Sequence, residues 1–201
     1  MKSFFWNFIT AFFKVLIQSK SAISQRKKTD ANIAIAVDTD ASTQNYAVAS
    51  DQTTTLSPAG IELIRQFEGL KLEAYLDTAG VCTIGYGTTV YPNGIPVQIN
   101  DHCSVEQAKG YMLHDVSRFE KAVTSAVNVP LTQHQFDALV SLTYNIGVTA
   151  FHHSTLLKRL NQGDYLAASQ QFDVWVKAGG ETLQGLVNRR LIEKSHFLRS
   201  R

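Results

Sequence analysis

Glu68, Asp77 and Thr83 are the residues of this chain whose types and spacing could do chemistry. Asp77 follows Glu68 by nine residues, and Thr83 follows Asp77 by six. Two carboxylates displayed on different elements around one cleft are what glycoside hydrolysis needs. One donates a proton to the leaving oxygen, and the other handles water or the developing positive charge. A single Glu is usually a solvated surface residue, so the interpretation rests on the three residues together.

The segment before Glu68 is predicted to be a helix that ends at this residue. Ser57 suits the N-cap and Pro58 the first helical position, while Gly69 suits the stop. Apolar residues recur on one face of the helix: Ile61, Ile64 and Phe67. Glu68 therefore lies at the negative end of a helix dipole beside an aromatic ring. Both effects favour the protonated carboxyl that a general acid requires.

The other two candidates lie in a predicted β region. Asp77 to Gly80 is typical of a turn between two extended runs, so Asp77 could cap the turn, present a carboxylate, or do both. Thr83 falls in a predicted strand, Val81 to Tyr86, where β-propensity alone would explain a threonine. Gly85 and Gly87 leave room for a ligand or another backbone, but no third glycine or helix start follows, which excludes a nucleotide-binding loop.

The remaining pattern predicts an α+β fold, with a small antiparallel β region followed by a mostly helical lobe and the active-site cleft between them. Asn93-Gly94 is a strong hairpin signal within a β region of residues 72–100. Capping boxes, Ser104 with Gln107 and Thr132 with Gln135, begin two helices. Further helices are expected near residues 154–162, 164–177 and 187–198.

The run from Phe67 to Gly87 resembles the phage-type lysozymes, the T-even and lambdoid endolysins of glycoside hydrolase family 24. In that family a Glu, an Asp nine residues on and a Thr six further form the catalytic triad. The resemblance covers about Ser57 to Phe197 and includes these stretches: Gln135 to Gly147, Ser154 to Leu157, Trp175, Ala178 to Gly180, Gly185-Leu186 and Arg189-Arg190. It implies that Glu68 is the general acid and that Asp77 and Thr83 position the attacking water.

The same resemblance implies the substrate and the type of enzyme. The expected activity is that of an endo-acting N-acetylmuramidase, which cleaves the β-1,4 bond between N-acetylmuramic acid and N-acetylglucosamine in bacterial peptidoglycan with inversion at the anomeric carbon. Asp77 is present, which favours hydrolysis over the transglycosylation of a related subgroup. Tyr144, Asn145 and Ser154 fall where the family lines its cleft, although ordinary helix packing would also explain them. Arg189 and Arg190 could contact acidic peptide stems or pair with Glu193.

Other classes of function compete with this hypothesis. An antibacterial effector muramidase is an alternative to a lysis enzyme, whereas a non-catalytic peptidoglycan-binding module would be expected to lose one of the three triad residues.

We expect a monomer without cofactor or metal, because no Cys/His spacing of a zinc site is present and the six histidines are scattered. Six of the 19 Lys and Arg residues and four of the 17 Asp and Glu residues lie in 1–56, so residues 57–201 are formally neutral. Nucleic-acid binding is therefore not expected.

The N-terminus differs from the rest of the chain. Residues 1–28 combine an aromatic-rich apolar run with basic residues. The apolar run is too short to span a bilayer. They could act as an export signal or signal-anchor, or as an interfacial amphipathic helix that contacts a membrane. They match poorly the Gly/Ala-rich anchors found in the family. Residues 29–56 have the composition of a flexible linker, which leaves 57–201 as the muramidase domain. The enzyme would reach periplasmic or cell-wall peptidoglycan by export, or by release from the host cytoplasm.

Cys82 and Cys103 are the two cysteines. The predicted hairpin could bring them together as a disulfide, which would persist in a periplasm. Two free buried thiols are the simpler expectation.

Overall fold

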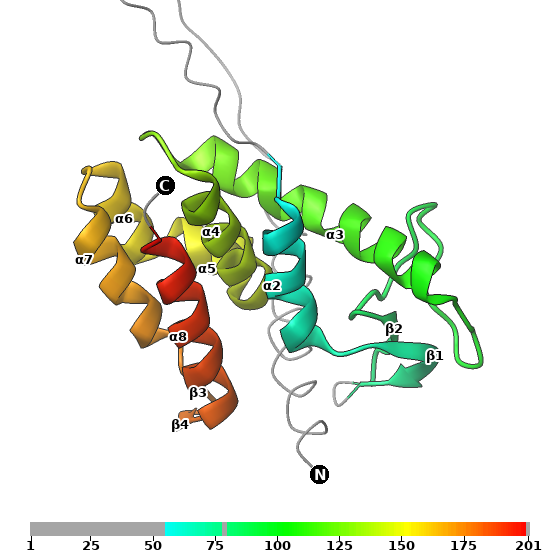
Figure 1. Ribbon diagram of the computed structural model, residues 1–201. Helices are drawn as coiled ribbons and strands as arrows, with labels where there is room; N and C mark the ends of the chain where they lie inside the picture. The colour runs from blue at the N-terminus through cyan, green and yellow to red at the C-terminus, as the bar shows by residue number, and fades with distance from the viewer. Residues whose placement is uncertain (1–54, 78–79, 200–201) are drawn as a thin grey trace, which may run out of the picture.

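The structure is a computed structural model that describes residues 55–77 and 80–199. The predicted N-terminal segment and nearly all of the predicted linker lie outside the described residues. Within them, helices dominate and two short antiparallel strand pairs complete the fold (Figure 1). The predicted α+β class, with a small β region and a mostly helical lobe, is therefore confirmed.

The elements follow one another along the chain in this order: α2 Pro58–Glu68, β1 Lys71–Leu76, β2 Cys82–Gly85, α3 Val105–Ala126, α4 Gln133–Ile146, α5 Val148–His152, α6 Thr155–Asn161, α7 Tyr165–Gln170, the 3-10 helix η1 Gln171–Val174, β3 Lys177–Ala178, β4 Glu181–Thr182 and α8 Gln184–Phe197. The predicted helix over residues 164–177 is wrong in its second half. The chain tightens into η1 and then forms the β3–β4 hairpin, whose turn uses Gly179 and Gly180 at positive φ. Neither this hairpin nor α5 was predicted.

The predicted caps fix where the long helices begin. Ser104 Oγ accepts a hydrogen bond from the Gln107 backbone N–H at 3.1 Å, and Gln107 Oε1 accepts one from the Ser104 N–H at 2.8 Å. Thr132 and Gln135 form the same reciprocal pair at the start of α4. Each box satisfies two backbone donors that the first helical turn leaves without partners.

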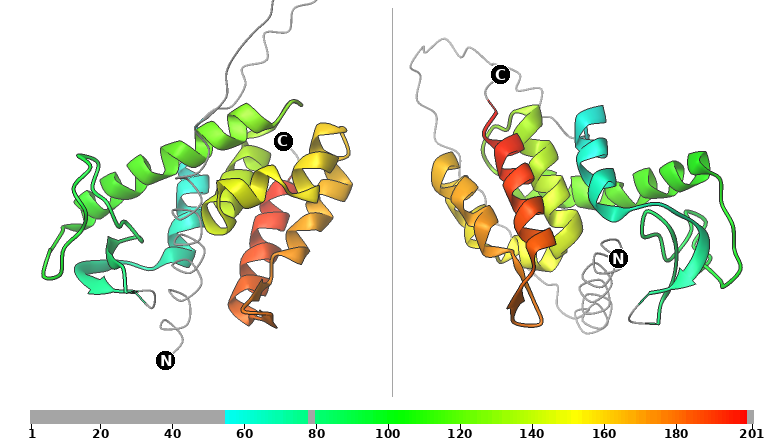
Figure 2. Two further views of the ribbon diagram at one scale, coloured as in Figure 1. Left: turned by 180° about the vertical axis from the view of Figure 1, so that it is seen from behind. Right: turned by 60° about the horizontal axis from the view of Figure 1, so that its bottom comes forward.

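Helix α4 is the centre of the core. It packs against α2, α3 and α8, and its residues from Phe136 to Ile146 are all buried. Helix α3 runs from the β region at one end of the molecule to the helical group at the other (Figures 1 and 2). Burial of the apolar faces against α4 is therefore what fixes α2 and α8 relative to each other.

The predicted Asn93-Gly94 hairpin forms as a turn without regular strands. The Tyr91 N–H donates to Ile95 O at 2.8 Å, and Val90 and Pro96 form a single β-bridge. The Val97 N–H donates to Thr89 O at 3.0 Å on the other side of this bridge, so Pro96 occupies a position where no N–H is needed.

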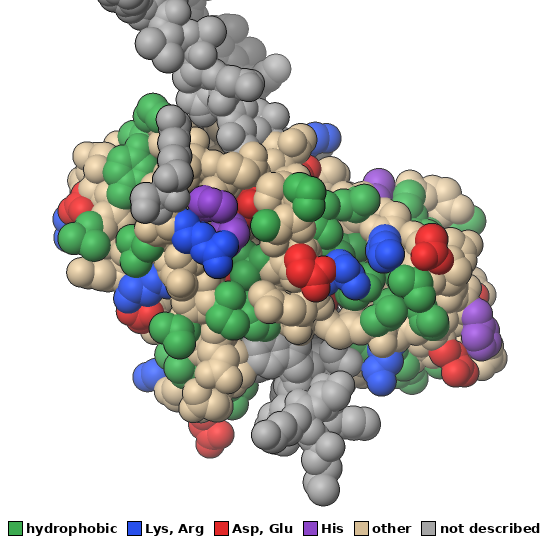
Figure 3. All heavy atoms as spheres, in the orientation of Figure 1, with side chains coloured by type: hydrophobic (Ala, Val, Ile, Leu, Met, Phe, Trp, Pro, Cys, Tyr) green, Lys and Arg blue, Asp and Glu red, His purple; other side chains and the backbone are tan. Residues whose placement is uncertain are grey.

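The surface mixes charged and apolar side chains. On the face seen in Figure 3, Lys and Arg side chains alternate with Asp, Glu and apolar groups over both ends of the molecule. No helix among the described residues is both long and apolar enough to cross a bilayer. Both cysteines are free thiols, as expected, but only Cys103 is buried, whereas Cys82 is half-buried. Burial raises the pKa of Cys103.

Candidate active site

Glu68 is the last residue of α2, where the sequence placed it. Ser57 caps the helix by accepting a hydrogen bond from Gly60 N at 3.1 Å, and Pro58 occupies the first turn. Gly69 ends it with φ of 67°, a conformation that glycine adopts without strain. The Glu68 side chain is only 3% exposed, so it is a buried carboxyl at a helix end.

Arg189 on α8 is the partner of Glu68. Its Nη1 donates to Glu68 Oε1 at 2.9 Å, and its guanidinium lies over the Phe67 ring with the carbon 5.0 Å from the centroid. Sequence reasoning considered only the helix dipole and Phe67 around Glu68, and it missed the positive charge. Arg189 lies in one of the stretches that carry the family resemblance, so its importance could be inferred from the sequence. Its pairing with Glu68 could not, because the two residues are 121 positions apart.

Arg189 belongs to a buried network of four charges. Glu193 Oε1 accepts from Arg189 Nε at 2.9 Å and from the Ser141 hydroxyl at 2.6 Å. Arg190 Nη2 donates to Glu193 Oε1 at 3.2 Å, and Arg190 Nε lies 2.9 Å from Glu193 Oε2 as an ion pair. Two guanidinium and two carboxyl groups thus balance in charge inside the protein, which offsets their desolvation.

Of the two alternatives for Arg189 and Arg190, the structure has the ion pair with Glu193. Both arginines are buried, with relative exposures of 0% and 1%, so neither presents a guanidinium to a peptide stem. Burial lowers the pKa of Arg190 to about 10, although Glu193 acts in the opposite direction. The pair is therefore part of the core that holds α4 against α8.

Asp77 and Thr83 lie on the β1–β2 hairpin. Tyr75 is opposite Thr83 in the antiparallel register, and the Asp77 N–H donates to Val81 O at 2.9 Å, which extends the ladder by one pair. Because residues opposite each other in a ladder point to the same side, Tyr75 and Thr83 share one face of the hairpin, and Asp77 follows at the end of β1. Asp77 also caps the turn as predicted, since its Oδ1 accepts from Val81 N at 2.9 Å.

Tyr75 links this face to Glu68. Burial and, to a smaller extent, the negative charges of Asp77 and Glu68 together raise the pKa of Tyr75 to about 12. Tyr144, which is fully buried, has its pKa raised by burial and then by the charge of Glu68. Both carboxylates of the predicted acid–base pair therefore act on one tyrosine, although they come from different elements.

The three predicted substrate-binding residues all have structural partners. Tyr144 donates its hydroxyl proton to Tyr86 O at 3.2 Å, and Asn145 Oδ1 accepts from Arg190 at 3.0 Å. Ser154 caps α6 by accepting from Leu157 N at 3.0 Å. All three are less than a tenth exposed. Their contact with a glycan, like the predicted cleft itself, stays a prediction.

This arrangement is that of a lysozyme-like protein: an acidic residue at the end of the helix before a small hairpin, a second carboxylate on that hairpin, and a helical lobe behind them. The family model described as phage lysozyme matches residues 65–193. The chain belongs to the phage lysozyme family.

Individual relatives agree with this assignment. The chain is similar to an endolysin of Acyrthosiphon pisum secondary endosymbiont phage 1, with 45% identity over 71% of this chain and 97% of that protein. It is similar in structure to an endolysin from Escherichia coli O157:H7 phage FAHEc1, with a TM-score of 0.67 and 46% identity over 72% of this chain and 93% of the other. A SAR-endolysin of Escherichia phage Mu is 38% identical over 66% of this chain and 77% of that protein.

Proposed function

We propose that this chain is an endo-acting muramidase that lyses bacterial cell walls by hydrolysing the bond between N-acetylmuramic acid and N-acetylglucosamine. It is a peptidoglycan hydrolase of the lysozyme type by family. The observation that carries the assignment of the reacting groups is that Glu68 is a buried carboxyl at the end of α2 and Asp77 lies on the hairpin that follows it. Two carboxylates from different elements around one point are the requirement of the reaction.

Glu68 is the general acid in this mechanism. Arg189 holds the carboxyl through Oε1, and we assign proton transfer to the other oxygen, Oε2. The acid is the protonated form of Glu68, and when it gives up its proton the carboxylate regains the ion pair with the Arg189 guanidinium at 2.9 Å. The aromatic ring of Phe67 below Arg189 and the surrounding burial keep the pair in one geometry.

Asp77 and Thr83 hold and activate the water. The Thr83 hydroxyl donates to Val81 O at 3.0 Å, so toward the water it acts as an acceptor and orients one O–H. The Asp77 carboxylate takes the other proton as water attacks C1 from the face opposite the leaving group. A water between acid and base gives inversion, in agreement with the resemblance to the T-even type.

The N-terminal segment serves delivery to the substrate. Relatives named SAR-endolysin support export as one role of residues 1–28. Contact with a membrane surface through the aromatic and basic residues is the other role. Cell fractionation distinguishes export from membrane contact. In both cases the substrate is cell-wall peptidoglycan, and the catalytic residues all lie beyond residue 56.

The test is the loss of turbidity of purified peptidoglycan, followed by mass analysis of the muropeptides. Muropeptides with reducing-end N-acetylmuramic acid support the muramidase. Anhydro sugars would indicate a transglycosylase, and binding without turbidity loss would indicate a non-catalytic module. Glu68→Gln is the matched inactive control.

A further inference from the structure

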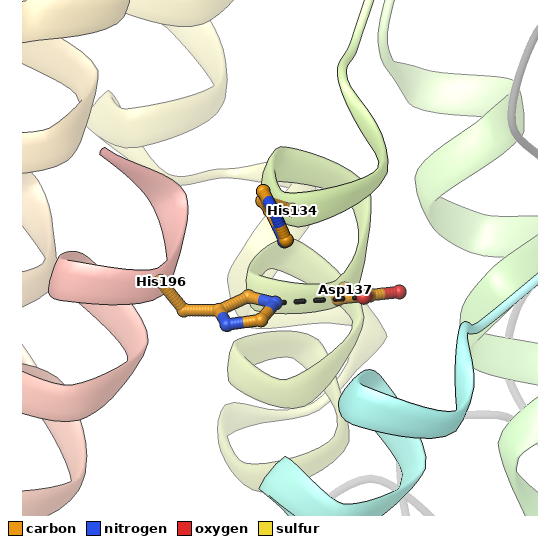
Figure 4. Close-up of side chains that lie close together, drawn as sticks. All are labelled: His134, Asp137 and His196. Atoms are coloured by element: carbon orange, nitrogen blue, oxygen red, sulfur yellow. Dashed lines mark hydrogen bonds and ion pairs between the residues drawn. The ribbon is translucent and has the colours of Figure 1, made fainter. Parts of the chain in front are cut away.

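His134, Asp137 and His196 gather where the start of α4 meets the end of α8 (Figure 4). One nitrogen or oxygen atom from each residue lies within 4.8 Å of the others. We propose that these three residues bind one divalent zinc ion that fastens α8 to α4. Sequence spacing did not predict the site, because His134 and Asp137 lie one turn apart on α4 whereas His196 comes 59 residues after Asp137.

Asp137 is held in place as a ligand by other residues. Its Oδ1 accepts from Ser57 N at 3.0 Å and from Gln133 Nε2 at 2.8 Å, and its Oδ2 accepts from the Ser57 hydroxyl at 2.5 Å. Partners of this kind orient a metal-binding carboxylate. A carboxylate oxygen has a second lone pair, so Oδ2 can also bind an ion on the side that faces His196.

His196 is placed at a distance suited to an ion. Its Nε2 lies 3.5 Å from Asp137 Oδ2, which is long for a hydrogen bond. Two ligand atoms of a tetrahedral zinc ion with bonds of about 2.1 Å lie roughly 3.4 Å apart. The separation of His196 and Asp137 therefore matches one edge of such a site without rearrangement.

His134 supplies the third ligand. Its Nδ1 is buried and has no hydrogen-bond partner among the residues that the structure describes. The ring lies edge-on to His196 with centroids 4.8 Å apart. A side-chain rotation that brings the His134 ligand atom up to about 1.4 Å closer completes three tetrahedral positions. Coordination would satisfy a ring nitrogen that is otherwise costly to bury.

The chemistry of the ligands selects the ion. Two imidazoles with one carboxylate suit zinc and similar transition metals, whereas calcium and magnesium prefer oxygen ligands alone. Three protein ligands leave a fourth position for water. His134 is only half-buried, and histidine side chains reach the surface between α8 and α2 in Figure 3, so an ion has access from solvent.

The site lies at the end of the scaffold opposite Glu68. Asp137 binds Ser57 at the start of α2, and Glu68 ends that helix eleven residues later, roughly 16 Å away along the axis. Helix α8, which carries His196, also carries Arg189. The ion would thus brace the helices that hold the Glu68–Arg189 pair without entering the hydrolysis reaction.

Zinc titration of the full chain tests the proposal. The protein is freed of metal with a chelator and dialysed, and zinc chloride is added in a calorimeter at pH 7.5. We expect one ion per chain and a rise in melting temperature. His134→Gln should weaken binding by more than about tenfold, since loss of even an outer partner costs that much. Cobalt(II), used as a second probe, should give the visible absorption of a tetrahedral site.

The control variant is His152→Gln. His152 and His153 are exposed neighbours that could bind zinc weakly at the surface, and His152 has no part in the proposed site. The variant should bind zinc like the wild type. The proposal is overturned if the wild type binds no ion at up to about 100 times the protein concentration, or if His134→Gln binds as tightly as the wild type. His134 makes no hydrogen bond from Nδ1, so this variant should fold and both outcomes are readable.

Discussion

Arg189 and Glu68 form a buried ion pair that joins the end of α2 to α8, with 2.9 Å between the bonded atoms and side-chain exposures of 0% and 3%. The pair belongs to a neutral set of two arginines and two glutamates. The proposed general acid is therefore also part of the core, and any substitution at Glu68 changes both chemistry and stability. The first prediction separates the two effects.

Glu68→Gln should reduce the rate of peptidoglycan hydrolysis by at least about 100-fold, because the amide keeps the shape but cannot give up a proton to the leaving oxygen. It should also lower the free energy of unfolding by about 1–3 kcal/mol, because Arg189 loses one of its two charged partners. Turbidity rates divided by the folded fraction, taken from circular dichroism, measure the chemical part alone.

Two matched variants control for the structural part. Glu193→Gln removes the same charge from the same network without touching the proposed acid, and Ser141→Ala removes only the hydroxyl donor to Glu193. Both should lose stability and keep activity within about tenfold of the wild type. If Glu193→Gln is as inactive as Glu68→Gln, the role of Glu68 is structural.

Asp77→Asn should also cost at least about 100-fold in rate, because the variant cannot take a proton from water. The fold should survive, since an asparagine oxygen can still accept from Val81 N. Asp101→Asn is the control, because Asp101 also accepts a backbone N–H in the β region, from Gln98, and has no proposed part in catalysis. Equal rates for Asp77→Asn and Asp101→Asn would remove Asp77 from the mechanism.

The local features of the fold were predictable from the sequence, and the long-range pairings were not. Ser57, Ser104 and Thr132 are caps whose partners lie three residues away, so their geometry follows from spacing. The turn at Asp77 is equally local. The bond between Arg189 and Glu68 depends instead on how α8 packs on α4 and α2, and no periodicity encodes that packing. The same limit hid the meeting of His196 with Asp137.

The stability of the metal-free protein should depend on His196 below neutral pH. Burial lowers the pKa of His196 below its ordinary 6.5, His134 lowers it further, and the bond to Asp137 partly opposes this. The unfolded chain then binds more protons than the folded one, so this contribution is complete above about pH 6.5 and is lost as pH falls through the folded pKa. Urea midpoints at pH 7.5 and 5.5, measured in chelator, report it.

His196→Gln should remove that part of the pH dependence, and His152→Gln should keep it. The quantity compared is the difference in urea midpoint between pH 7.5 and pH 5.5. A lower overall stability of His196→Gln therefore does not affect the comparison. An unchanged difference in His196→Gln would assign the pH dependence to other groups.

A chain that begins at Thr55 should fold and hydrolyse purified peptidoglycan like the full protein. The contacts at this end between residues that the structure describes are retained: Gln133 donates to Thr55 O at 3.0 Å, Leu56 N donates to Glu120 at 2.8 Å, and Ser57 binds Asp137. Residues 1–54 hold the aromatic run and the basic excess but none of the proposed catalytic groups.

Partition to membranes, or lysis of cells from within, should therefore depend on residues 1–28. Fractionation and lysis assays on both chains measure this. Equal membrane partition of the shortened chain would rule out the segment as the membrane contact, and loss of activity on free peptidoglycan would show that the segment completes the enzyme domain.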